Sequence, residues 1–551
     1  MISPMESHCL PFREIPHTAK LFSSFLGDFS RVAAYYAHPP TTAGIDAAAG
    51  EVRLDPSVRS AVVGILREQN LRFAQSEIDS ATRRNLDRLA AGAVAIVTGQ
   101  QVGLFSGPAY TIYKAISAIR CAEETTRRGI EAVPIFWLAT EDHDLAEVNQ
   151  SSWVTRNGLA RYDLPTHDAD AGRRVGEVML GSAIDPLVDT AAQTLEGPGA
   201  EDVARALRHS YRSGETYGSA FGKLMARLLA GRGMIFIDPL DPRFHRLAAH
   251  VFSQAVRDAA LLREALVARS QELDGAGFHA QVKVTQETTL LFRSVAGRRE
   301  PVRSRNGAFV VGDAELSGQQ FAAAIESTPE EFSPSALLRP VVQDTLLPTA
   351  AYIGGPAEVA YMAQAQVVYH KLLGRMPAIL PRASFTIVEP PIARFLAQYG
   401  LEVRDLFAGP QQVRAAMEQK SLSGALAARF DAAEQDVQKL MAAFEEPLGR
   451  LDVTLVDALR STQSKMLHQF GQLKGKVARA ESFRSGVLER HQRILFDALY
   501  PNAAMQERTL CALPLLASCG LGLLDDLAAM ASLESPAGGR SCAQDHQILF
   551  L

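Results

Sequence analysis

Short apolar runs recur along the chain, and each is followed by a polar or glycine-rich loop and then by a helical pattern. The runs occupy residues 93–97, 133–139, 233–237, 350–353 and 377–380. Runs of this length that alternate with helices are typical of buried parallel strands joined by crossover helices. The chain is therefore expected to have an α/β fold built on an open parallel sheet.

The helix predicted after the first run has one apolar face. It is expected to open at residues 107–108, because proline in the first helical position loses no needed hydrogen bond, and to stop at Gly129. Lys114 lies off the apolar stripe, and a second Gly-Pro pair precedes a helix predicted over residues 357–373. The stripe consists of Ile112, Ala115, Ile116, Ile119 and Ala122.

Two stretches interrupt the strand and helix alternation. Residues 150–232 are polar and partly helical without an obvious strand series, which indicates an inserted segment. Residues 278–313 alternate between apolar and polar positions at 279–284 and carry turn signals at Ala296-Gly297 and Asn306-Gly307. This second stretch predicts a small antiparallel insertion.

The hydrophobic period changes after residue 389. Apolar residues then step by threes and fours over residues 422–444 and 451–480, with an interruption near 447–449. The pattern predicts two long helices folded into an antiparallel coiled coil; amphipathic helices packed on the main body are the alternative. The last residues, 501–551, are expected to form helices followed by an apolar segment, 548–551, that returns to the main body.

These patterns give a domain plan with seven parts. Residues 1–150 hold N-terminal helices, amphipathic over 58–89, and the first half of the core; 151–232 form a mostly helical insertion; 233–270 continue the core; 271–340 form a β-rich insertion; 341–390 complete the core; 391–500 form the coiled coil; and 501–551 form the C-terminal helices and returning segment.

Composition is that of an ordinary globular protein of several parts. Of the 551 residues, 47% are apolar and 21% charged, and the net charge of −5 argues against nucleic acid as the main partner. The longest oily stretch, 510–524, contains a proline and a glycine and is shorter than the roughly 20 residues that cross a bilayer. No membrane partner is expected, and the protein is predicted to be cytoplasmic.

The five cysteines are odd in number and lack any CxxC spacing. This pattern predicts neither a disulfide framework nor a thiolate zinc site, and reduced thiols are expected. Cys121 lies well inside the first predicted helix, so it is interpreted as a core or surface thiol rather than as a nucleophile.

The loop after the first strand, residues 98–107, places three glycines between a strand and a helix. Main-chain N–H groups at such a place suit phosphate or carboxylate, although the loop matches neither a Walker motif nor GxGxxG, and a tight connection is the alternative. The paired glutamines favour an anion site, because buried amides need partners. The candidate binding residues here are Thr98, Gly99, Gln100, Gln101, Gly103, Ser106, Gly107 and Tyr110.

The loop after the second strand concentrates three acids and an imidazole in Glu141, Asp142, His143 and Asp144. This set suits a metal, a substrate ammonium or a general base, and a solvated helix start is the alternative. No HExxH-type spacing is present, so direct substrate binding is favoured over a metal site. Because parallel strands end at the same edge of a sheet, the two loops are expected to open into one crevice.

Further candidates follow later strands. Lys114 and Arg382 are candidate cations for a phosphate or carboxylate. Asp238 and Asp241 are preferred as helix caps rather than as site residues. The remaining candidates for the same rim are Gly354, Gly355, Glu358, Gln364 and Ser384.

At these residues the chain resembles the BshC family, the cysteine ligases of bacillithiol biosynthesis. The resemblance rests on TGQQVGLFSGPAYTIYKA at 98–115, PIFWLATEDHD at 134–144, GGPAEVAYMAQ at 354–364 and PRASFTIVE at 381–389. It implies a Rossmann-like core related to class I synthetases and nucleotidyltransferases, two insertions and a coiled coil that forms a homodimer. The implied reaction joins the carboxyl group of L-cysteine to the amine of glucosaminyl-malate.

Two departures from the family pattern concern the acidic motif. Members often continue it with an aromatic residue and end it in Asn-His, whereas Leu145 and Asn149-Gln150 stand here. These differences leave the acceptor sugar open.

The resemblance also suggests a mechanism. An amide forms from a carboxylate only after activation, as an acyl phosphate or acyl adenylate, so ATP or another nucleotide is the expected cofactor, with the metal requirement open. Its phosphates are expected over residues 98–107, with Lys114 and Arg382 countering charge. Asp142 and Asp144 would hold an ammonium group, and His143 would contact the phosphoryl group or take a proton from the amine. The alternatives are a non-catalytic dimeric nucleotide- or thiol-binding protein, or a ligase or nucleotidyltransferase that acts on another acid.

Overall fold

The computed structural model describes residues 6–420, 424–483, 486–533 and 544–551. The chain divides into two units. The larger unit contains His8–Thr386 and Glu507–Gln547, and the smaller one consists mainly of Ile387–Gln506.

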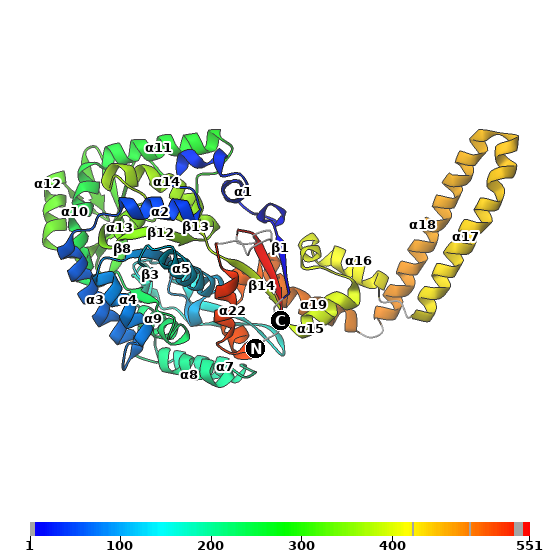
Figure 1. The fold of residues 1–551 in the computed structure, drawn as a ribbon, viewed down its shortest axis with the longest axis horizontal. Helices are drawn as coiled ribbons and strands as arrows, with labels where there is room; N and C mark the ends of the chain where they lie inside the picture. Colours follow the sequence, from blue (N-terminus) through cyan, green and yellow to red (C-terminus); the bar gives the residue numbers. More distant parts are fainter. Residues whose placement is uncertain (1–5, 421–423, 484–485, 534–543) are drawn as a thin grey trace. The chain divides into compact units, whose positions relative to one another are not determined.

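The larger unit is built on a five-stranded parallel sheet in the order β13–β12–β2–β3–β6 (Figure 1). The five predicted runs are confirmed as its strands. β2 pairs with β3 over its whole length, from Val94 opposite Ala132 to Gln100 opposite Leu138. The strands are β2 (Val94–Gln100), β3 (Ala132–Leu138), β6 (Ile235–Ile237), β12 (Thr349–Gly354) and β13 (Ala378–Pro381).

Helices cover both faces of this sheet. Alternate strand residues such as Ala95, Val97, Ile135 and Trp137 enter one core cluster together with helix residues. Strand residues of the opposite parity, such as Phe136, pack against Phe221 of another helix. The α-helices in this part of the larger unit are α1 (Lys20–Gly27), α2 (Thr42–Glu51), α3 (Pro56–Ala74), α4 (Ser80–Ala90), α5 (Tyr110–Arg127), α6 (Leu145–Val148), α10 (Pro242–Arg257), α11 (Ala259–Gly275), α13 (Arg339–Leu346) and α14 (Pro356–Leu372).

The helix after β2 begins later than predicted. α5 starts at Tyr110, and Pro108 precedes it in an isolated bridge with Cys511, so the expectation of proline in the first helical position is wrong. The pairing with the C-terminal segment holds Pro108 outside the helix. The predicted stop is confirmed, because Arg128 caps α5 and Gly129 has a φ of +95°.

The first insertion contains a hairpin that the sequence did not predict. β4 (Gln150–Thr155) pairs antiparallel with β5 (Gly158–Asp163), and three helices follow: α7 (Ile184–Gln193), α8 (Ala200–Ser210) and α9 (Tyr217–Leu228). The hairpin is hard to predict because its strands are mostly polar, with Trp153 and Tyr162 as their large buried side chains.

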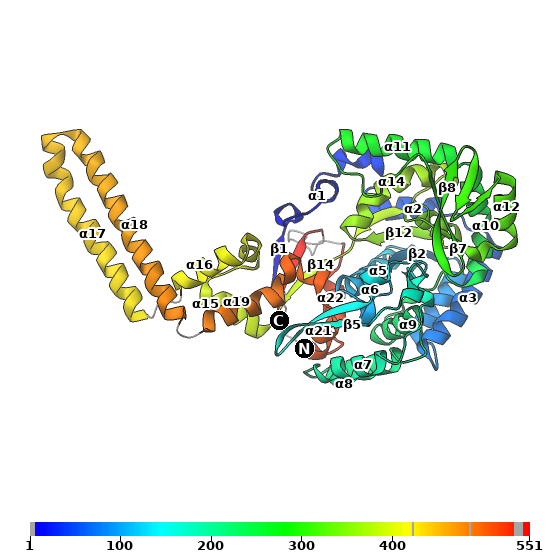
Figure 2. The ribbon, with the colours of Figure 1, turned by 180° about the vertical axis from the view of Figure 1, so that it is seen from behind.

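The second insertion is a five-stranded antiparallel sheet, as expected, and Figure 2 shows its long strands β7 and β8. Both predicted turns are confirmed, since Ala296 and Asn306 take positive φ angles between strands. Residues 279–284 form no strand, and the expectation there is wrong. The main chain of Val282 is hydrogen-bonded to the Gln364 side chain. Val282 N donates to Gln364 Oε1 at 2.8 Å, and Gln364 Nε2 donates to Val282 O at 2.9 Å. The elements are β7 (Thr288–Val295), β8 (Arg298–Arg305), β9 (Ala308–Val311), β10 (Ala314–Leu316), α12 (Gly318–Ser327) and β11 (Phe332–Pro334).

The smaller unit carries the predicted helical hairpin, formed by α17 (Gly424–Leu451) and α18 (Val453–Phe483) side by side (Figure 1). The expected break at residues 447–449 is wrong, because Pro447 lies inside α17 and the chain turns at Asp452. Asp452 Oδ1 accepts a hydrogen bond from Thr454 N at 2.8 Å and so caps α18. Leu422 and the side chain of Ala480, both in the predicted stripe, lie outside the described residues. The unit also contains α15 (Pro390–Tyr399), α16 (Pro410–Lys420) and α19 (Val487–Leu499).

The C-terminal segment comprises α20 (Gln506–Thr509), α21 (Leu513–Cys519), α22 (Leu523–Met530) and β15 (His546–Phe550). β15 lies in a three-stranded sheet between β1 (Glu6–Leu10) and β14 (Ser384–Val388). Residues 548–551 belong to the smaller unit, so the expectation that they return to the main body is wrong. Across the described ranges, no single helix is long and apolar enough to cross a bilayer; α21 and α22 pass that test only together, across a 110° bend.

The thiols differ in part from expectation. Cys121 and Cys511 are free thiols, and burial raises the pKa of the Cys121 thiol to about 12, as suits a packed residue. The expectation of reduced thiols is wrong at Cys9, which is disulfide-bonded. Spacing along the chain does not reveal which cysteines approach each other in space.

Candidate active site

A cavity of about 1040 Å³ opens at the carboxyl ends of the parallel strands, within the larger unit. The strand order places it where the topology reverses, because the chain runs from β2 outward to β3 and β6 and then crosses back to β12. Ligands of open α/β sheets bind at such a switch point. The β-rich insertion forms the opposite wall, through residues 282–292 and Arg299.

The cavity brings together the glutamine loop and the acidic loop, as the sequence predicts. Gly99 marks their close approach: a side chain on it would meet the Trp137 carbonyl oxygen at 2.8 Å. The predicted residues that line the cavity are Gly99, Gln100, Gln101, Tyr110, Lys114, Glu141, Asp142, His143, Gly355, Glu358 and Arg382. The predicted residues outside its lining are Thr98, Gly103, Ser106, Gly107, Asp144, Gly354, Gln364 and Ser384.

The second half of the glutamine loop is a tight connection. Gly103 and Gly107 lie so close that a side chain on Gly103 would meet the Gly107 Cα at 2.9 Å. Phe105, between them, packs edge to face against Trp153 and Tyr211 and is fully buried. Thr98 is also buried, with Oγ1 donating to Ile353 O at 2.9 Å. Of residues 98–107, the expected phosphate-binding segment, only Gly99, Gln100 and Gln101 therefore line the cavity.

Three other predicted residues serve local structure. Asp144 is exposed and caps the short helix α6 by accepting from Glu147 N at 3.3 Å. Gln364 bonds the Val282 main chain, as described above. Ser384 Oγ donates to Glu507 Oε1 at 2.8 Å and is buried.

Lys114 is buried in the cavity wall and fully bonded. Its Nζ donates to Gly99 O at 2.9 Å and to Gln100 Oε1 at 2.7 Å, and it forms an ion pair with Glu358. Glu358 also accepts from Gly355 N at 2.8 Å, at the start of α14, and from the Tyr352 hydroxyl at 2.6 Å. Burial lowers the pKa of Lys114, while Glu358 opposes that shift. Through these bonds, the Lys114–Glu358 pair links the carboxyl ends of β2 and β12.

Arg382 is held by a buried carboxylate from the C-terminal segment. Its two terminal nitrogens donate to Glu507 at 2.8 and 2.6 Å, and both side chains are nearly inaccessible. Its guanidinium lies 5.4 Å from the centre of the Tyr110 ring. Arg382 therefore forms part of the cavity wall, and its charge is already paired with that of Glu507.

Asp142 and His143 are fixed by both walls of the cavity. Asp142 accepts from Gln101 Nε2 at 2.7 Å and from His143 N at 2.8 Å. Burial opposes its ionisation, but these hydrogen bonds prevail and hold the pKa of Asp142 below its usual range. Arg299, from β8, places Nη1 3.0 Å from His143 Nδ1 and its guanidinium 3.8 Å from the centre of the Phe292 ring.

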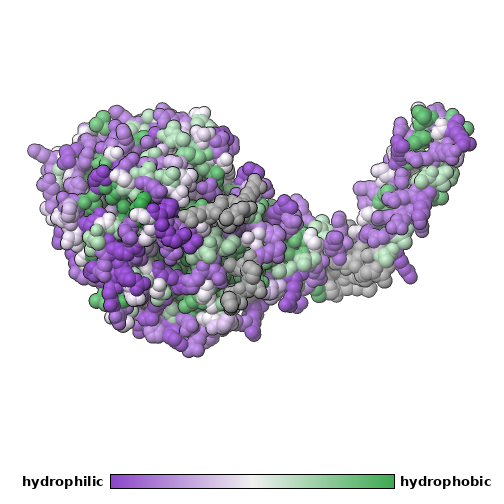
Figure 3. Space-filling model, in the orientation of Figure 1, coloured by the Kyte–Doolittle hydropathy of each residue, from purple (hydrophilic) through white to green (hydrophobic). Residues whose placement is uncertain are grey.

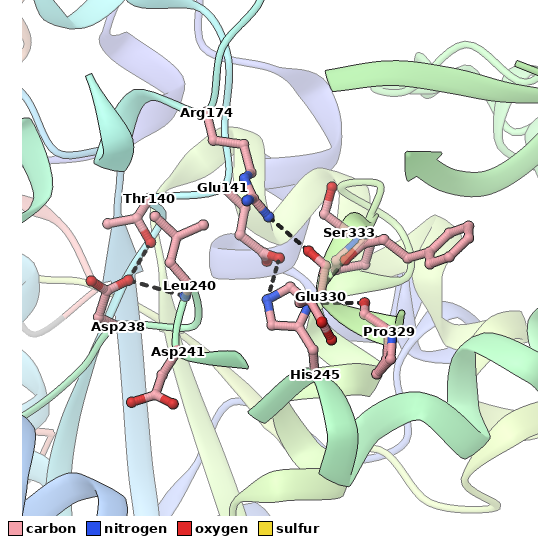
Figure 4. Close-up of polar contacts among 12 residues, drawn as sticks. Thr140, Glu141, Arg174, Asp238, Leu240, Asp241, His245, Pro329, Glu330 and Ser333 are labelled. Atoms are coloured by element: carbon pink, nitrogen blue, oxygen red, sulfur yellow. Dashed lines mark hydrogen bonds and ion pairs between the residues drawn. The ribbon is translucent and has the colours of Figure 1, made fainter. Parts of the chain in front are cut away.

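Glu141 is 7% exposed and faces both the cavity and a buried histidine. Its Oε1 lies 3.5 Å from His245 Nε2, and Figure 4 shows the two groups pointing toward each other beside Arg174. Burial raises the pKa of Glu141, and His245, Arg299 and Arg174 oppose that rise.

The two aspartates after β6 behave differently from each other (Figure 4). Asp241 caps α10 by accepting from Arg243 N at 3.1 Å, as expected. Asp238 caps no helix, and the preference for a cap there is wrong. It accepts from the Thr140 hydroxyl at 2.6 Å and from Leu240 N at 3.1 Å, which fixes the start of the acidic loop.

The cavity wall is rich in cations. Seven lysines and arginines line it against four acids, although the chain as a whole carries a net charge of −5. Sequence reasoning missed five of these cations, because they come from the β-rich insertion, from α13 and from the C-terminal segment: Lys283, Arg299, Arg303, Arg339 and Arg508. Arg508 directly follows Glu507, and its charge acts on Tyr110. No group of three or more metal-ligating side chains is found across the described part of the chain.

Residues 5–383 match the family description "Bacillithiol biosynthesis BshC, N-terminal Rossmann-like domain", and residues 385–537 match its "C-terminal coiled-coil domain". The chain belongs to the BshC family. A relative from Koribacter versatilis, named "Putative cysteine ligase BshC", is 41% identical over 94% of this chain and 96% of its own. Relatives of the same name from Solibacter usitatus and Salinibacter ruber are 37% and 32% identical over 94% and 96% of this chain, and over 96% and 97% of their own.

These BshC relatives confirm two expectations. The Rossmann-like core with a C-terminal coiled coil is the family's architecture, and the chain is a ligase of that family. The family assignment also places the chain in bacillithiol biosynthesis.

Proposed function

We propose that the cavity joins the carboxyl group of L-cysteine to the amine of glucosaminyl-malate, with a nucleoside triphosphate, ATP or a relative, as the source of activation. The observation that carries the proposal is the meeting of the two family motifs in one cavity at the switch point of the sheet. At about 1040 Å³ the cavity reaches the upper end of the usual range for ligand sites, roughly 300–1,000 Å³, which leaves room for two reactants.

Asp142 is the proposed partner of the cysteine ammonium. Its carboxylate is ionised, half-buried and held in place by Gln101 and His143 N. A charge-assisted hydrogen bond from an ammonium to such a carboxylate is about twice as strong as a neutral one. The neighbouring Asp144 is exposed and occupied as a helix cap, so the ammonium is assigned to Asp142 alone.

The cations of the wall suit the anionic groups of the other reactants. Lys114 and Arg382 are already paired with Glu358 and Glu507, respectively. They are therefore proposed to determine the shape of the site and its electrostatic potential. The exposed Lys283 and Arg508 are the better candidates to contact phosphate or malate carboxylates. When bound, the nucleotide supplies the leaving group on the cysteine carboxyl.

The contact with Arg299 bears on the role of His143. A guanidinium only donates hydrogen bonds, so His143 Nδ1 accepts from Arg299, and the neutral ring carries its hydrogen on Nε2. A ring in this tautomer donates from Nε2. Of the two roles considered for His143, contact with the phosphoryl group is therefore favoured over removal of a proton from the amine.

The test is an incubation of the purified protein with ATP, L-cysteine and glucosaminyl-malate, followed by mass spectrometry of the thiol product. The proposal predicts a product that carries one cysteine in amide linkage and forms only with all three reactants. Binding of nucleotide or cysteine without product supports the non-catalytic alternative. Product from a different acid supports the ligase or nucleotidyltransferase alternative.

The helical hairpin is proposed to form a homodimer. α17 and α18 expose apolar side chains along their length, and Figure 3 shows apolar residues on the hairpin surface. Exposed large apolar residues in such a pair of helices are typical of a seam covered by a partner.

A reaction that uses ATP is proposed to take place in the cytoplasm.

A further inference from the structure

Glu141 and His245 form a buried pair at the cavity wall. Glu141 lines the cavity, and His245 stands behind it on α10, with 3% of its surface exposed. Within the described residues, His245 is the only basic side chain within 4 Å of the Glu141 carboxyl group. The Glu141 atom that faces it, Oε1, is buried and lacks a hydrogen bond of normal geometry.

The main chain fixes which nitrogen of His245 carries hydrogen. Nδ1 lies 2.9 Å from Phe332 O and 3.3 Å from Pro329 O (Figure 4 labels Pro329). Carbonyl oxygens only accept hydrogen bonds, so Nδ1 must donate. Nε2, the nitrogen that faces Glu141, is therefore the one that gains or loses a proton.

The facing atoms require one proton between them. An ionised Glu141 opposite a neutral His245 would set a carboxylate oxygen against a nitrogen lone pair in a buried place, without a hydrogen to join them. A proton on either partner removes this conflict, as a carboxylic acid donating to Nε2 or as an imidazolium donating to the carboxylate. Burial favours the uncharged form of Glu141, whereas Arg299 on β8 and Arg174, between β5 and α7, favour the charged form. The negative charge of Asp238, after β6, has a weaker effect and raises the pKa of Glu141.

We infer that Glu141 is the proton acceptor of the ligation step and that His245 is the positioning residue that receives the proton behind it. This inference rests on the proposed function. As the amine nitrogen attacks the activated cysteine carboxyl, the carbon–nitrogen bond forms and the bond from carbon to the leaving oxygen breaks, with its electron pair. The proton of the attacking nitrogen passes to Glu141, and the proton already shared moves to His245 Nε2. One proton then returns to solvent, which restores the resting pair with its single shared proton.

The location supports this assignment over His143. Glu141 directly precedes Asp142, the proposed ammonium site, so the acceptor stands next to the bound cysteine. His143 is bonded through Nδ1 to Arg299 and presents an N–H to the cavity, which cannot accept a proton. Glu141 lines the cavity, and His245 behind it can receive a proton through Nε2.

The experiment compares two nucleophiles in the full-length protein. With ATP and cysteine, product is measured with glucosaminyl-malate or with hydroxylamine, which is largely unprotonated at neutral pH and needs little help in losing a proton. The variants are Glu141→Gln, which keeps the size of the side chain, and His245→Asn, whose amide can still donate to Phe332 O. Glu215→Gln, at a half-buried glutamate that binds Lys223, is the matched control.

The inference predicts a split between the nucleophiles. Amide formation with the sugar amine should fall about 10²- to 10⁴-fold in both variants, the usual range for loss of a general base, while hydroxamate formation stays close to the wild-type rate. The acidic limb of the pH–rate profile with the sugar amine should disappear. Equal losses with both nucleophiles, or an unchanged rate and profile with the sugar amine, would overturn the inference.

A second measurement separates this inference from the proposed function. If the wild-type protein makes neither product, the proposed function fails, and ¹⁵N spectra of labelled histidine still test the pair. The His245 signals should show a hydrogen on Nδ1 and a titration at Nε2 that changes in Glu141→Gln. A His245 titration that is identical in wild type and variant would show that the two groups share no proton.

Discussion

At the scale of single residues, the site separates aspartates that the sequence alone treats alike. Asp142 and Asp144 lie in the same acidic motif, yet Asp142 is held in the cavity wall by Gln101, whereas Asp144 caps a short exposed helix. Motif membership therefore predicts location in the loop but not which carboxylate faces the substrate.

The Asp142→Asn variant tests this difference. Loss of the charged acceptor should raise the KM for cysteine about 10- to 100-fold, which corresponds to the roughly 1.5–3 kcal/mol of a charged hydrogen bond. Asp144→Asn should change KM less than threefold, an estimate based on its exposed position. Steady-state kinetics with varied cysteine measures both. Equal effects of the two substitutions would contradict the assignment.

Arg382 and Glu507 give a prediction on stability. Both are nearly fully buried, so Glu507→Gln leaves the guanidinium without its counter-charge, which should reduce the free energy of unfolding by about 3–5 kcal/mol. Glu201→Gln, which removes the exposed ion pair with Arg205, should cost less than about 0.5 kcal/mol. Denaturant unfolding monitored by circular dichroism measures both. Comparable small losses would mean that the buried pair contributes little.

At the scale of elements, hydrophobic pattern predicted the strands better than it predicted how each segment ends. The five apolar runs all became strands of the parallel sheet because each is buried on both faces. The polar hairpin β4–β5 and the late start of α5 escaped prediction because both depend on contacts with residues distant in sequence, such as the bridge between Pro108 and Cys511. The long hairpin turns at Asp452, which caps α18. Pro447 is a stronger break signal in the sequence, and it misled the prediction of where the turn lies.

The helical hairpin carries the prediction at this scale. Leu440 and Phe444, which are 54% and 49% exposed in α17, should lie in the dimer seam. The double substitution Leu440→Glu and Phe444→Glu should convert a dimer into a monomer in light scattering coupled to size exclusion. Leu261→Glu, at a 56% exposed site on α11, is the control and should leave the dimer intact. A wild-type monomer, or a dimer that survives the double substitution, would contradict the proposal.

At the scale of the whole molecule, the site depends on segments that are far apart in the chain. The sequence predicted the meeting of the glutamine and acidic loops, since both follow neighbouring parallel strands. It did not predict Arg299 or Arg508, because nothing in a β-rich insertion or a C-terminal tail indicates which face it presents. The part of the wall formed by the two loops was thus accessible to sequence reasoning, and the part built by tertiary contacts was not.

The C-terminal segment also makes stability depend on pH. His546 is buried between Ser384 and Thr386, and burial lowers its pKa to about 4. The unfolded chain, with a histidine pKa of about 6.5, therefore binds more protons than the folded one between these values. Stability should fall by about 1.4 kcal/mol for each pH unit as pH drops through this window.

Unfolding curves at several pH values test this prediction. The slope attributable to His546 should be absent in His546→Gln, whereas His209→Gln, at an exposed histidine, should behave as wild type. An unchanged slope in His546→Gln would show that other groups cause the pH dependence.

The most direct test of the central claim is a crystal structure with L-cysteine and a non-hydrolysable nucleotide analogue bound. We expect the cysteine ammonium within hydrogen-bond distance of Asp142, its carboxyl group beside Glu141 and His143, and the phosphates against the cations of the same cavity wall. Cysteine or nucleotide bound elsewhere, with this cavity left to solvent, would contradict the claim that the two loops form the ligase site.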